Sequence, residues 1–574
     1  MLDVHLIRPT RYDLDGYPLQ WWRSLVPSNS LACLTGIVED AATRNVLGEG
    51  VGITVHARDE IHADIRLEDI IAAARRGDRT VFVGLVGVQT NQYPRALDIA
   101  RILRREGIAV CIGGFHVSGC LAMLPGLTPE LQEAIDLGVS LFAGEAEDGR
   151  IDDVLRDAYA GTLKPLYNYL KHTPNLAGAP VPVTAEADIE RSVGRFSSFD
   201  LGRGCPFECS FCTIINVQGR KSRFRTPDDL EQIIRNNAAR NVTRFFLTDD
   251  NFARNKNWEP LIDRVLKLRE EGLRISFTIQ VDTLAHHIPN FIEKVCRAGA
   301  NQIFIGLENI NSDSLEYSKK RQNRIEEYQE MFMAWRQSGA LITCGYIIGF
   351  PNDTYDSIMA DIEKIKETMP IDILYVNFLT PLPGCEDHRK AIDRGDWIDG
   401  DLNKFTLSHR VTHHNRMTDE DWEAAYRDAY ASFYSWEHME RILKRRHVLG
   451  APAPLTTMHR LICHRETQRL EDVSAMEGGI FRIRRRRQRR HGMAIEPAIL
   501  FYPKIGWKSV HAVAGILATY VRLRLMRKRI RANPARGAYR DASLQIAGTA
   551  GADFGILQTR LTEHAERRIK RANA

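Results

Sequence analysis

Two stretches of the chain alternate short apolar runs with amphipathic helical patterns, and this rhythm restricts the fold more than any other feature. The first stretch has apolar runs at residues 4–7, 53–56, 81–88, 109–112 and 139–142. Segments between them, such as LEDIIAAARRGDR, repeat apolar residues three and four positions apart. Strands and helices that alternate in this way build a parallel sheet covered by helices on both faces. We therefore predict an α/β fold with a Rossmann-like domain over residues 1–170.

A second alternating series follows residues 171–195, which are rich in Pro and Ala and are predicted to be a linker. Its predicted strands are residues 199–201, 244–247, 275–281, 302–306, 342–348 and 373–378. Six βα units predict a partial (β/α)6 barrel over residues 196–410, with a site at the carboxyl ends of the strands. Residues 411–574 are predicted to form a helical C-terminal region.

The size and composition of the chain exclude several classes of protein. A chain of 574 residues divides into several domains, and 44% hydrophobic residues provide cores without help from metals or disulfides. The N-terminus is charged from Asp3 onward, unlike a secretory signal. Ten cysteines at irregular spacing do not form a disulfide framework. We expect reduced thiols and a cytoplasmic location.

Three of the ten cysteines lie within eight positions, in the sequence RGCPFECSFC. Cys205, Cys209 and Cys212 thus offer three thiolates from one loop. A structural zinc takes four ligands, and His286 and His287 are candidates for completing such a site. Three thiolates from one loop suit a 4Fe–4S cluster that keeps one iron open for a further ligand.

The cysteine loop, with Phe211 before its last cysteine, resembles the signature of the radical S-adenosylmethionine (SAM) superfamily. LTDDNF, FTIQVD, GLEN and GYIIGFPNDT follow in the order in which that superfamily contacts SAM. The resemblance covers residues 196–410. It implies that the three cysteines hold a 4Fe–4S cluster and that SAM is contacted by Asp249, Asp250, Gln280, Glu308 and Gly345.

The stretch before the barrel resembles the cobalamin-binding domain of cobalamin-dependent radical SAM enzymes, most clearly in GGFHVS and FAGEAE. The resemblance implies a cobalamin cofactor. Small residues such as Gly113 and Gly114 would let the corrin ring approach the backbone closely. His116 is a candidate for contact with cobalt or with the nucleotide tail. The D-x-H-x-x-G motif, which supplies a histidine to cobalt in some cobalamin enzymes, is absent.

The resemblance as a whole implies an enzyme that reductively cleaves SAM to a 5′-deoxyadenosyl radical. The expected reaction is methylation of an unactivated carbon in a small-molecule or lipid-like substrate, with electrons from a one-electron reductant protein. No catalytic acid or base is assigned. The sequence does not separate this reaction from a radical oxidative cyclisation or rearrangement.

Two other classes of function remain as alternatives. One is an RNA methylthiotransferase-like modification enzyme, although Cys33, Cys111 and Cys120 do not sit in the loops that its second cluster would need. The other is a non-catalytic, metal-binding adaptor, which would not cleave SAM when reduced.

Basic residues gather near the C-terminus. Residues 441–532 contain 22 Lys and Arg against 5 Asp and Glu, in a chain whose formal net charge is +5. The run FRIRRRRQRR precedes a segment with a predicted apolar face made of Val510, Val513, Leu517, Tyr520 and Met526. Interleaved charged and apolar residues favour peripheral contact of residues 481–531 with an anionic membrane, on its inner face. Nucleic acid is the less favoured polyanion.

Overall fold

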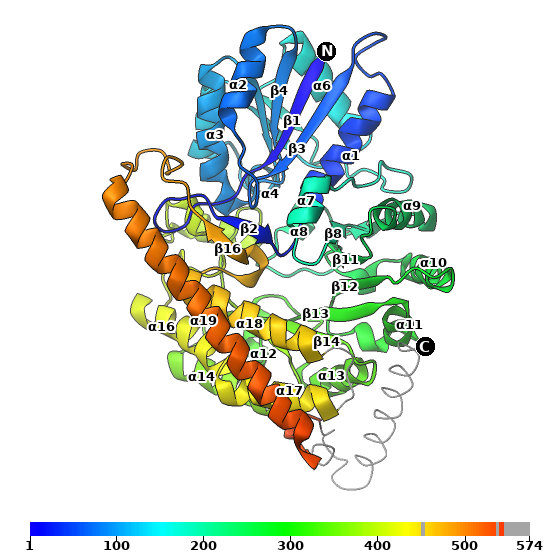
Figure 1. The fold of residues 1–574 in the computed structure, drawn as a ribbon, viewed down its shortest axis with the longest axis vertical. Coiled ribbons are helices and arrows are strands. Elements are labelled where there is room, and N and C mark those ends of the chain that lie inside the picture. Colours follow the sequence, from blue (N-terminus) through cyan, green and yellow to red (C-terminus); the bar gives the residue numbers. More distant parts are fainter. Residues whose placement is uncertain (449–453, 535–538, 545–574) are drawn as a thin grey trace. The chain divides into compact units, whose positions relative to one another are not determined.

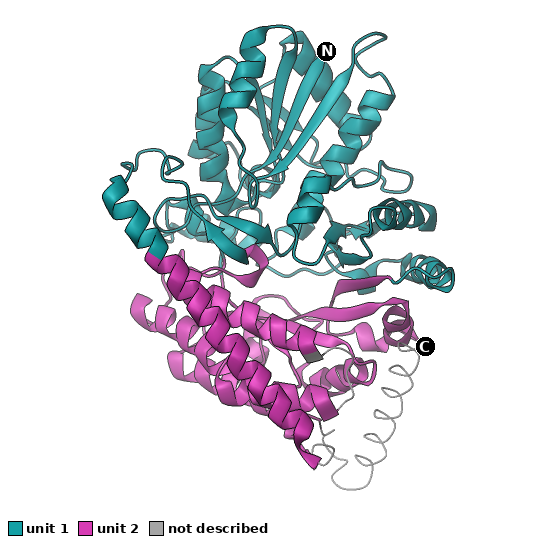
Figure 2. Ribbon diagram, in the orientation of Figure 1, with its two compact units in different colours: residues 1–274, 380–406, 479–506 teal, residues 275–379, 407–478, 507–574 magenta. Residues whose placement is uncertain are grey.

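The computed structural model describes residues 1–448, 454–534 and 539–544 (Figure 1). The chain divides into two compact units, each assembled from three separate segments (Figure 2). Unit 1 consists of residues 1–274, 380–406 and 479–506. Unit 2 consists of residues 275–379, 407–478 and 507–574. The predicted domain boundaries stay predictions, since the two units interleave along the chain.

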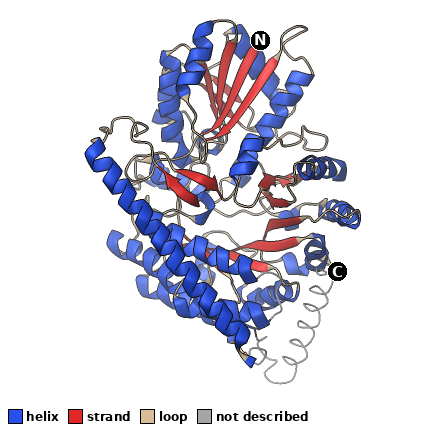
Figure 3. Cartoon of the chain, in the orientation of Figure 1, coloured by secondary structure: helices blue, strands red, loops and turns tan. Residues whose placement is uncertain are grey.

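The first sheet of unit 1 is parallel and has the strand order β3-β1-β4-β5-β6-β7 (Figures 1 and 3). Its strands are β1 (Leu2–Arg8), β3 (Ile53–Asp59), β4 (Thr80–Leu85), β5 (Ala109–Gly113), β6 (Ser140–Ala143) and β7 (Leu166–Asn168). The connecting helices are α1 (Asn29–Thr43), α2 (Leu67–Arg76), α3 (Tyr93–Arg105), α4 (Phe115–Met123), α5 (Pro129–Asp136) and α6 (Arg150–Ala160). β3 lies on one side of β1, and β4 to β7 follow in order on the other side, as in a doubly wound fold.

Both faces of this sheet are buried, because successive residues of a strand point to opposite sides. Val83 and Leu85 of β4 pack with residues of α2, α3, α4 and α5 in one apolar cluster. Phe82 of the same strand packs with residues of α1 and α6 in the other cluster. The predicted Rossmann-like domain is therefore confirmed.

The first barrel strands also belong to unit 1. The elements in chain order are α7 (Glu186–Arg191), β8 (Phe196–Phe199), β9 (Gly202–Arg203), α8 (Ile214–Val217), β10 (Arg223–Phe224), α9 (Pro227–Ala238), β11 (Arg244–Leu247) and α10 (Trp258–Glu270). β8 and β11 pair in parallel. The predicted strand at residues 199–201 is wrong in its bounds. β8 ends at Phe199, because Asp200 turns toward polar partners and the chain enters the short hairpin of β9 and β10.

Unit 2 contains a parallel sheet of β12 (Ser276–Val281), β13 (Ala300–Glu308), β14 (Leu341–Ile348) and β15 (Ile373–Phe378). Its helices include α11 (Phe291–Ala298), α12 (Ser312–Tyr317), α13 (Tyr328–Gln337), α14 (Tyr355–Thr368), α16 (Asp419–Phe433), α17 (Trp436–Val448) and α18 (Pro454–Glu471). Every residue of β14 is buried. With β8 and β11, these strands complete the six βα units predicted for a partial barrel, a prediction that is confirmed.

The remaining helices are α15 (Glu386–Arg394) in unit 1 and the long α19 (Ala498–Ala532), which continues from unit 1 into unit 2. α15 lies close to the cysteine loop, since the Ser210 hydroxyl donates to Asp387 at 3.0 Å. None of the helices in the described part of the chain combines the length and the apolar character needed to cross a membrane.

The C-terminal region is less helical than predicted. Residues Gly479–Ile483 form β16, which pairs antiparallel with β2 (Gln20–Ser24) in unit 1. Arg482 and Arg484 both pair with the carboxylate of Asp13, at 2.9 and 3.1 Å. The arginine run is thus folded against the N-terminal part of the chain, because acidic side chains there neutralise it.

Candidate functional site

The three cysteines lie in the loop that joins β9 to β10 in unit 1. These strands pair antiparallel with Arg203 opposite Arg223, so residues 204–222 form a loop with one narrow neck. Within the loop the Cys205 amide donates to the carbonyl oxygen of Gly219 at 3.2 Å. The loop backbone is therefore tied together by its own hydrogen bonds.

The thiols in this loop have the chemistry that a metal cluster needs. Cys209 is buried, and Cys205 and Cys212 are half-buried. Burial, followed by the neighbouring thiol of Cys209, raises the pKa of Cys212 to about 12. Iron ions would supply the positive charge that stabilises the thiolates.

The arrangement of possible ligands favours a cluster over a single zinc ion. Among the described residues, one group of ligating atoms close enough to share an ion contains His286, His287 and Glu327, and another contains His116. The cysteine loop is in neither group. The two candidate zinc histidines thus have a carboxylate neighbour of their own in unit 2, and the cysteine loop offers only its three thiols, one ligand fewer than a structural zinc takes.

Asp249 and Asp250 follow β11 and contact the base of the cysteine loop. The Leu201 amide donates to Asp249 at 2.7 Å, and the Gly204 amide donates to Asp250 at 3.2 Å. Burial raises the pKa of each carboxyl to about 7. A cationic ligand such as an ammonium group would favour the ionised carboxylates. The structure brings both residues to the loop, and their contact with SAM stays a prediction.

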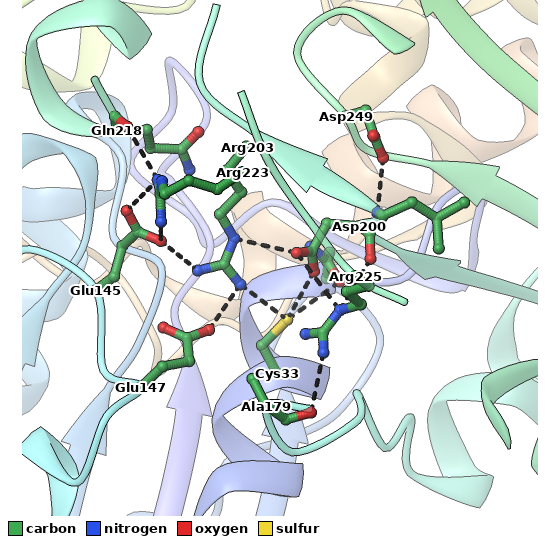
Figure 4. A network of polar contacts seen from close by, with 12 residues as sticks. Cys33, Glu145, Glu147, Ala179, Asp200, Arg203, Gln218, Arg223, Arg225 and Asp249 are labelled. Carbon is green, nitrogen blue, oxygen red and sulfur yellow. Dashed lines mark hydrogen bonds and ion pairs between the residues drawn. The ribbon is translucent and has the colours of Figure 1, made fainter. Parts of the chain in front are cut away.

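Sequence reasoning missed the charged residues at the neck of the loop. The guanidinium groups of Arg203 and Arg223 both contact Glu145, each at 2.6 Å (Figure 4). Arg203 also contacts Glu147 at 2.8 Å and Asp200 at 3.1 Å. The two glutamates belong to FAGEAE, directly after β6. Their place at a strand end was the available signal, but their arginine partners could not be read from the sequence.

The predicted cobalamin surface lies at the carboxyl ends of β4, β5 and β6. Gly87, Gly114 and Gly144 lie there, are half-exposed, and have φ angles of 63°, 150° and 103°. A Cβ atom on Gly114 would lie 2.2 Å from the nitrogen of Val88, so only glycine fits. Gly113 is half-exposed beside it. At Gly87 and Gly144 too, atoms of the chain itself lie within 2.7 and 3.1 Å of where a Cβ atom would be. These glycines therefore allow the strand ends to pack closely, and contact of this edge with cobalamin stays a prediction.

His116 is buried in the first turn of α4. Its Nε2 lies 3.4 Å from a carboxylate oxygen of Glu130, and its Nδ1 lies 3.3 Å from the hydroxyl of Thr90. Its ring lies 4.4 Å from that of Tyr93. The neighbours of His116 are therefore protein groups, and its contact with cobalamin stays a prediction.

The other predicted SAM contacts belong to unit 2. Glu308 ends β13 with a φ angle of 60°, which is uncommon for a residue other than glycine. Its carboxylate pairs with Lys320 at 2.7 Å, a residue that sequence reasoning missed. A Cβ atom on Gly345 would lie 3.6 Å from the same carboxylate. The structure thus brings Glu308 and Gly345 together, whereas Gln280 lies half-buried in β12.

Comparison with known proteins decides the family. Residues 200–365 match the Radical SAM superfamily, and this span contains the whole cysteine loop. The chain contains a radical SAM domain. It is 28% identical to the bacteriochlorophyllide d C-8(2)-methyltransferase of Chlorobaculum tepidum, over 62% of this chain and 78% of that one. It is 24% identical to the hopanoid C-2 methylase of Rhodopseudomonas palustris, over 66% and 68% of the two chains.

The fold is similar to that of OxsB, a cobalamin-dependent S-adenosylmethionine radical enzyme. The TM-score is 0.52 at 13% identity, over 99% of this chain and 84% of OxsB. This likeness concerns the fold, and it confirms the predicted succession of a Rossmann-like domain and a radical SAM barrel. The predicted resemblance of residues 196–410 to the radical SAM superfamily is likewise confirmed.

Proposed function

We propose that this radical SAM enzyme methylates an unactivated carbon of a small-molecule substrate with the help of cobalamin. The observation that carries the proposal lies within unit 1, where Glu145 joins the neck of the cysteine loop to the end of β6. Unit 1 therefore contains both the three-thiol loop and the glycine-lined ends of β4, β5 and β6. The methyltransferase names of the relatives support the choice of reaction.

Each set of residues has a proposed task. Cys205, Cys209 and Cys212 would hold the cluster. The carboxylates of Asp249 and Asp250 would orient a SAM ammonium group, and Gln280, Glu308 and Gly345 would complete SAM binding, as the family resemblance implies. The edge around Gly113 and Gly114 would hold cobalamin. When bound, the cluster supplies the electron that cleaves SAM, and cobalamin carries the methyl group.

The metal content tests the cofactor assignment. Protein purified without oxygen from cells supplied with cobalamin should contain about four iron and about one cobalt per chain. Replacing Cys205, Cys209 and Cys212 by Ala should remove the iron. Cys463→Ala is the matched control, because Cys463 is also a half-buried free thiol but lies in α18. Iron that persists in the triple variant would contradict the assignment.

The products formed from SAM separate methylation from cyclisation or rearrangement. A methylase of this kind consumes one SAM to form 5′-deoxyadenosine and a second SAM to replace the methyl group, which releases S-adenosylhomocysteine. The reduced enzyme with its substrate should therefore form both products. 5′-Deoxyadenosine without S-adenosylhomocysteine would favour the alternative reactions, and iron well above four per chain would favour methylthiolation.

We also propose peripheral contact with an anionic membrane, but through α19 and not through the whole of residues 481–531. One face of α19 carries large apolar side chains that are 37% to 81% exposed: Ile499, Tyr502, Trp507, Val510, Val513, Leu517, Val521 and Leu525. Their spacing of three to five residues makes one stripe, about 39 Å long at the rise of an α-helix. Phe501, Thr519, Leu523 and Met526 are buried, which corrects the prediction that Met526 shares the exposed face.

The charge of α19 suits an anionic surface. The segment from residue 497 to residue 540 contains no Asp or Glu, and α19 carries eight Lys and Arg. Arg524, Lys528 and Arg529 are exposed near the end of the stripe. An apolar face with aromatic residues and adjacent basic residues is typical of helices that lie in a membrane interface. Such a location would bring a lipid-like substrate within reach of the enzyme.

Vesicle binding tests the membrane proposal. The protein should sediment with vesicles that contain phosphatidylglycerol, and the triple change Val510→Ser, Leu517→Ser and Val521→Ser should weaken partitioning by about 100-fold. Ile392→Ser is the control, because Ile392 is an exposed apolar residue of α15. Equal partitioning of the triple variant, or binding to RNA but not to vesicles, would contradict the proposal.

A further inference from the structure

The neck of the cysteine loop is built from two like charges. Arg203 and Arg223 are directly opposite each other in the antiparallel pair of β9 and β10. Like charges in this position repel and destabilise a two-stranded pair. The pair is also only two residues long on each strand, so the strand pairing itself contributes few hydrogen bonds to the neck.

One carboxylate compensates both arginines. Glu145 Oε2 lies 2.6 Å from Nη1 of Arg203, and Glu145 Oε1 lies 2.6 Å from Nη2 of Arg223 (Figure 4). The three side chains are only 8% to 12% exposed. Charge pairs in such surroundings are weakly screened, and their loss leaves an uncompensated buried charge.

Further acceptors complete the environment of Arg203. Asp200 and Glu147 lie on its other sides, and both carboxylates are almost fully buried. Although burial opposes ionisation, Arg203 holds the pKa of Glu147 below its usual range, and Arg203 with Arg225 does the same for Asp200. Glu147 and Asp200 therefore carry negative charge beside Arg203.

We propose that Glu145 is a positioning residue, which fixes the cysteine loop against the carboxyl end of β6 and thereby sets where the cluster lies relative to the glycine-lined edge. The part of the inference that concerns the cluster rests on the proposed function. The fixation of the loop itself does not, because every contact that carries it is between side chains of this chain. Arg203 lies two residues before Cys205, so a shift of its guanidinium group displaces the first cluster ligand.

Hydrogen exchange of the cofactor-free protein tests the fixation. Glu145→Gln keeps the shape of the side chain but leaves two arginines uncompensated, so amides in residues 204–222 should exchange at least about tenfold faster. Glu60→Gln is the matched control. Glu60 also compensates a buried arginine of unit 1, Arg95, at 2.5 Å. The control should leave the exchange of residues 204–222 unchanged, and equal exchange in Glu145→Gln and the wild type would overturn the proposal.

A double variant separates charge from shape. In Glu145→Gln with Arg223→Gln the neck carries one arginine fewer, so the loop should recover part of its protection if the effect is electrostatic. Additive losses in the two single variants and the double variant would show that no coupling exists between these side chains and would overturn the proposal.

The reduction potential of the reconstituted cluster tests whether Glu145 influences the cluster as well as the loop. Removing a negative charge beside the loop favours the more negatively charged, reduced cluster, so the midpoint potential should become more positive in Glu145→Gln and stay unchanged in Glu60→Gln. An unchanged potential with a loosened loop would overturn the link to the cluster. A wild-type protein that binds no iron would instead overturn the proposed function, and the exchange experiment would still decide the fixation.

Discussion

Two basic regions of the C-terminal part of the chain meet their surroundings in opposite ways. In the run from Arg482 to Arg490, the arginines face acidic residues of unit 1, among them Asp13 and Asp401. In the C-terminal half of α19, Arg524, Lys528 and Arg529 are exposed beside an apolar stripe, in a segment that has no acidic residue. The number of arginines in a segment therefore does not predict a polyanionic partner. The deciding factor is whether the fold itself supplies the countercharge.

The largest expected effect comes from removing the countercharge of the run. Asp13→Ala leaves Arg482 and Arg484, which are 3% and 6% exposed, without their shared carboxylate. Loss of one partner of a buried pair costs about 3–5 kcal/mol, so the free energy of unfolding should fall by that amount. Chemical denaturation measures it.

Asp78→Ala is the control for this change, because Asp78 lies 4.0 Å from Arg79 in an exposed pair. It should alter the free energy of unfolding by less than about 1 kcal/mol. Equal effects of the two substitutions would mean that the run is not folded as described.

Asp249 is a buried carboxyl in a different environment, and it shows how burial affects protonation. Asp249 accepts hydrogen bonds from Leu201 and Asn255, and burial raises its pKa to about 7. The folded state then holds a proton that the unfolded state releases above about pH 4. The free energy of unfolding should therefore fall as the pH rises from about 4 to 7.

Asp249→Asn removes this titration, so the difference in stability between the wild type and the variant should shrink as the pH rises. Urea denaturation at a series of pH values measures the difference. A wild-type advantage that grows with pH would mean that the carboxylate is stabilised in its ionised form.

The basic residues of α19 should act on membrane binding and not on folding. Replacing Arg524, Lys528 and Arg529 by Gln should weaken binding to anionic vesicles by about 1 kcal/mol per charge and reduce its salt dependence. Sedimentation with vesicles at two salt concentrations measures both. Replacing Arg485, Arg486 and Arg487 by Gln should leave vesicle binding nearly unchanged. A loss of binding as large as that for α19 would contradict the difference between the two basic regions.

The smallest expected effect lies at the end of the arginine run. Arg490 pairs with Asp401 at 2.8 Å, but both side chains are about 30% exposed. Pairs of this kind contribute about 1 kcal/mol or less. Arg490→Gln should therefore change the free energy of unfolding far less than Asp13→Ala. A loss of similar size would show that the exposure of an ion pair in the run does not determine its contribution to stability.

Local patterns were enough to predict much of the fold. The alternation of strands and helices predicted both parallel sheets. The three-cysteine spacing and the ordered motifs after it predicted the family. Errors came where a distant partner decides, as at residues 479–483, where a predicted helical region pairs as a strand with residues 20–24.

The sequence by itself determined the order of the elements, the cysteine loop and the chemical character of its ligands, because strand and helix periodicity and ligand spacing are local properties. Only the tertiary structure decided which charges are compensated. Asp13 and Arg482 are 469 positions apart, and Glu145 and Arg223 are 78 positions apart. Electrostatic pairing depends on distance in space and on burial, so no local pattern could show that one arginine run is neutralised while the apolar face of α19 stays exposed.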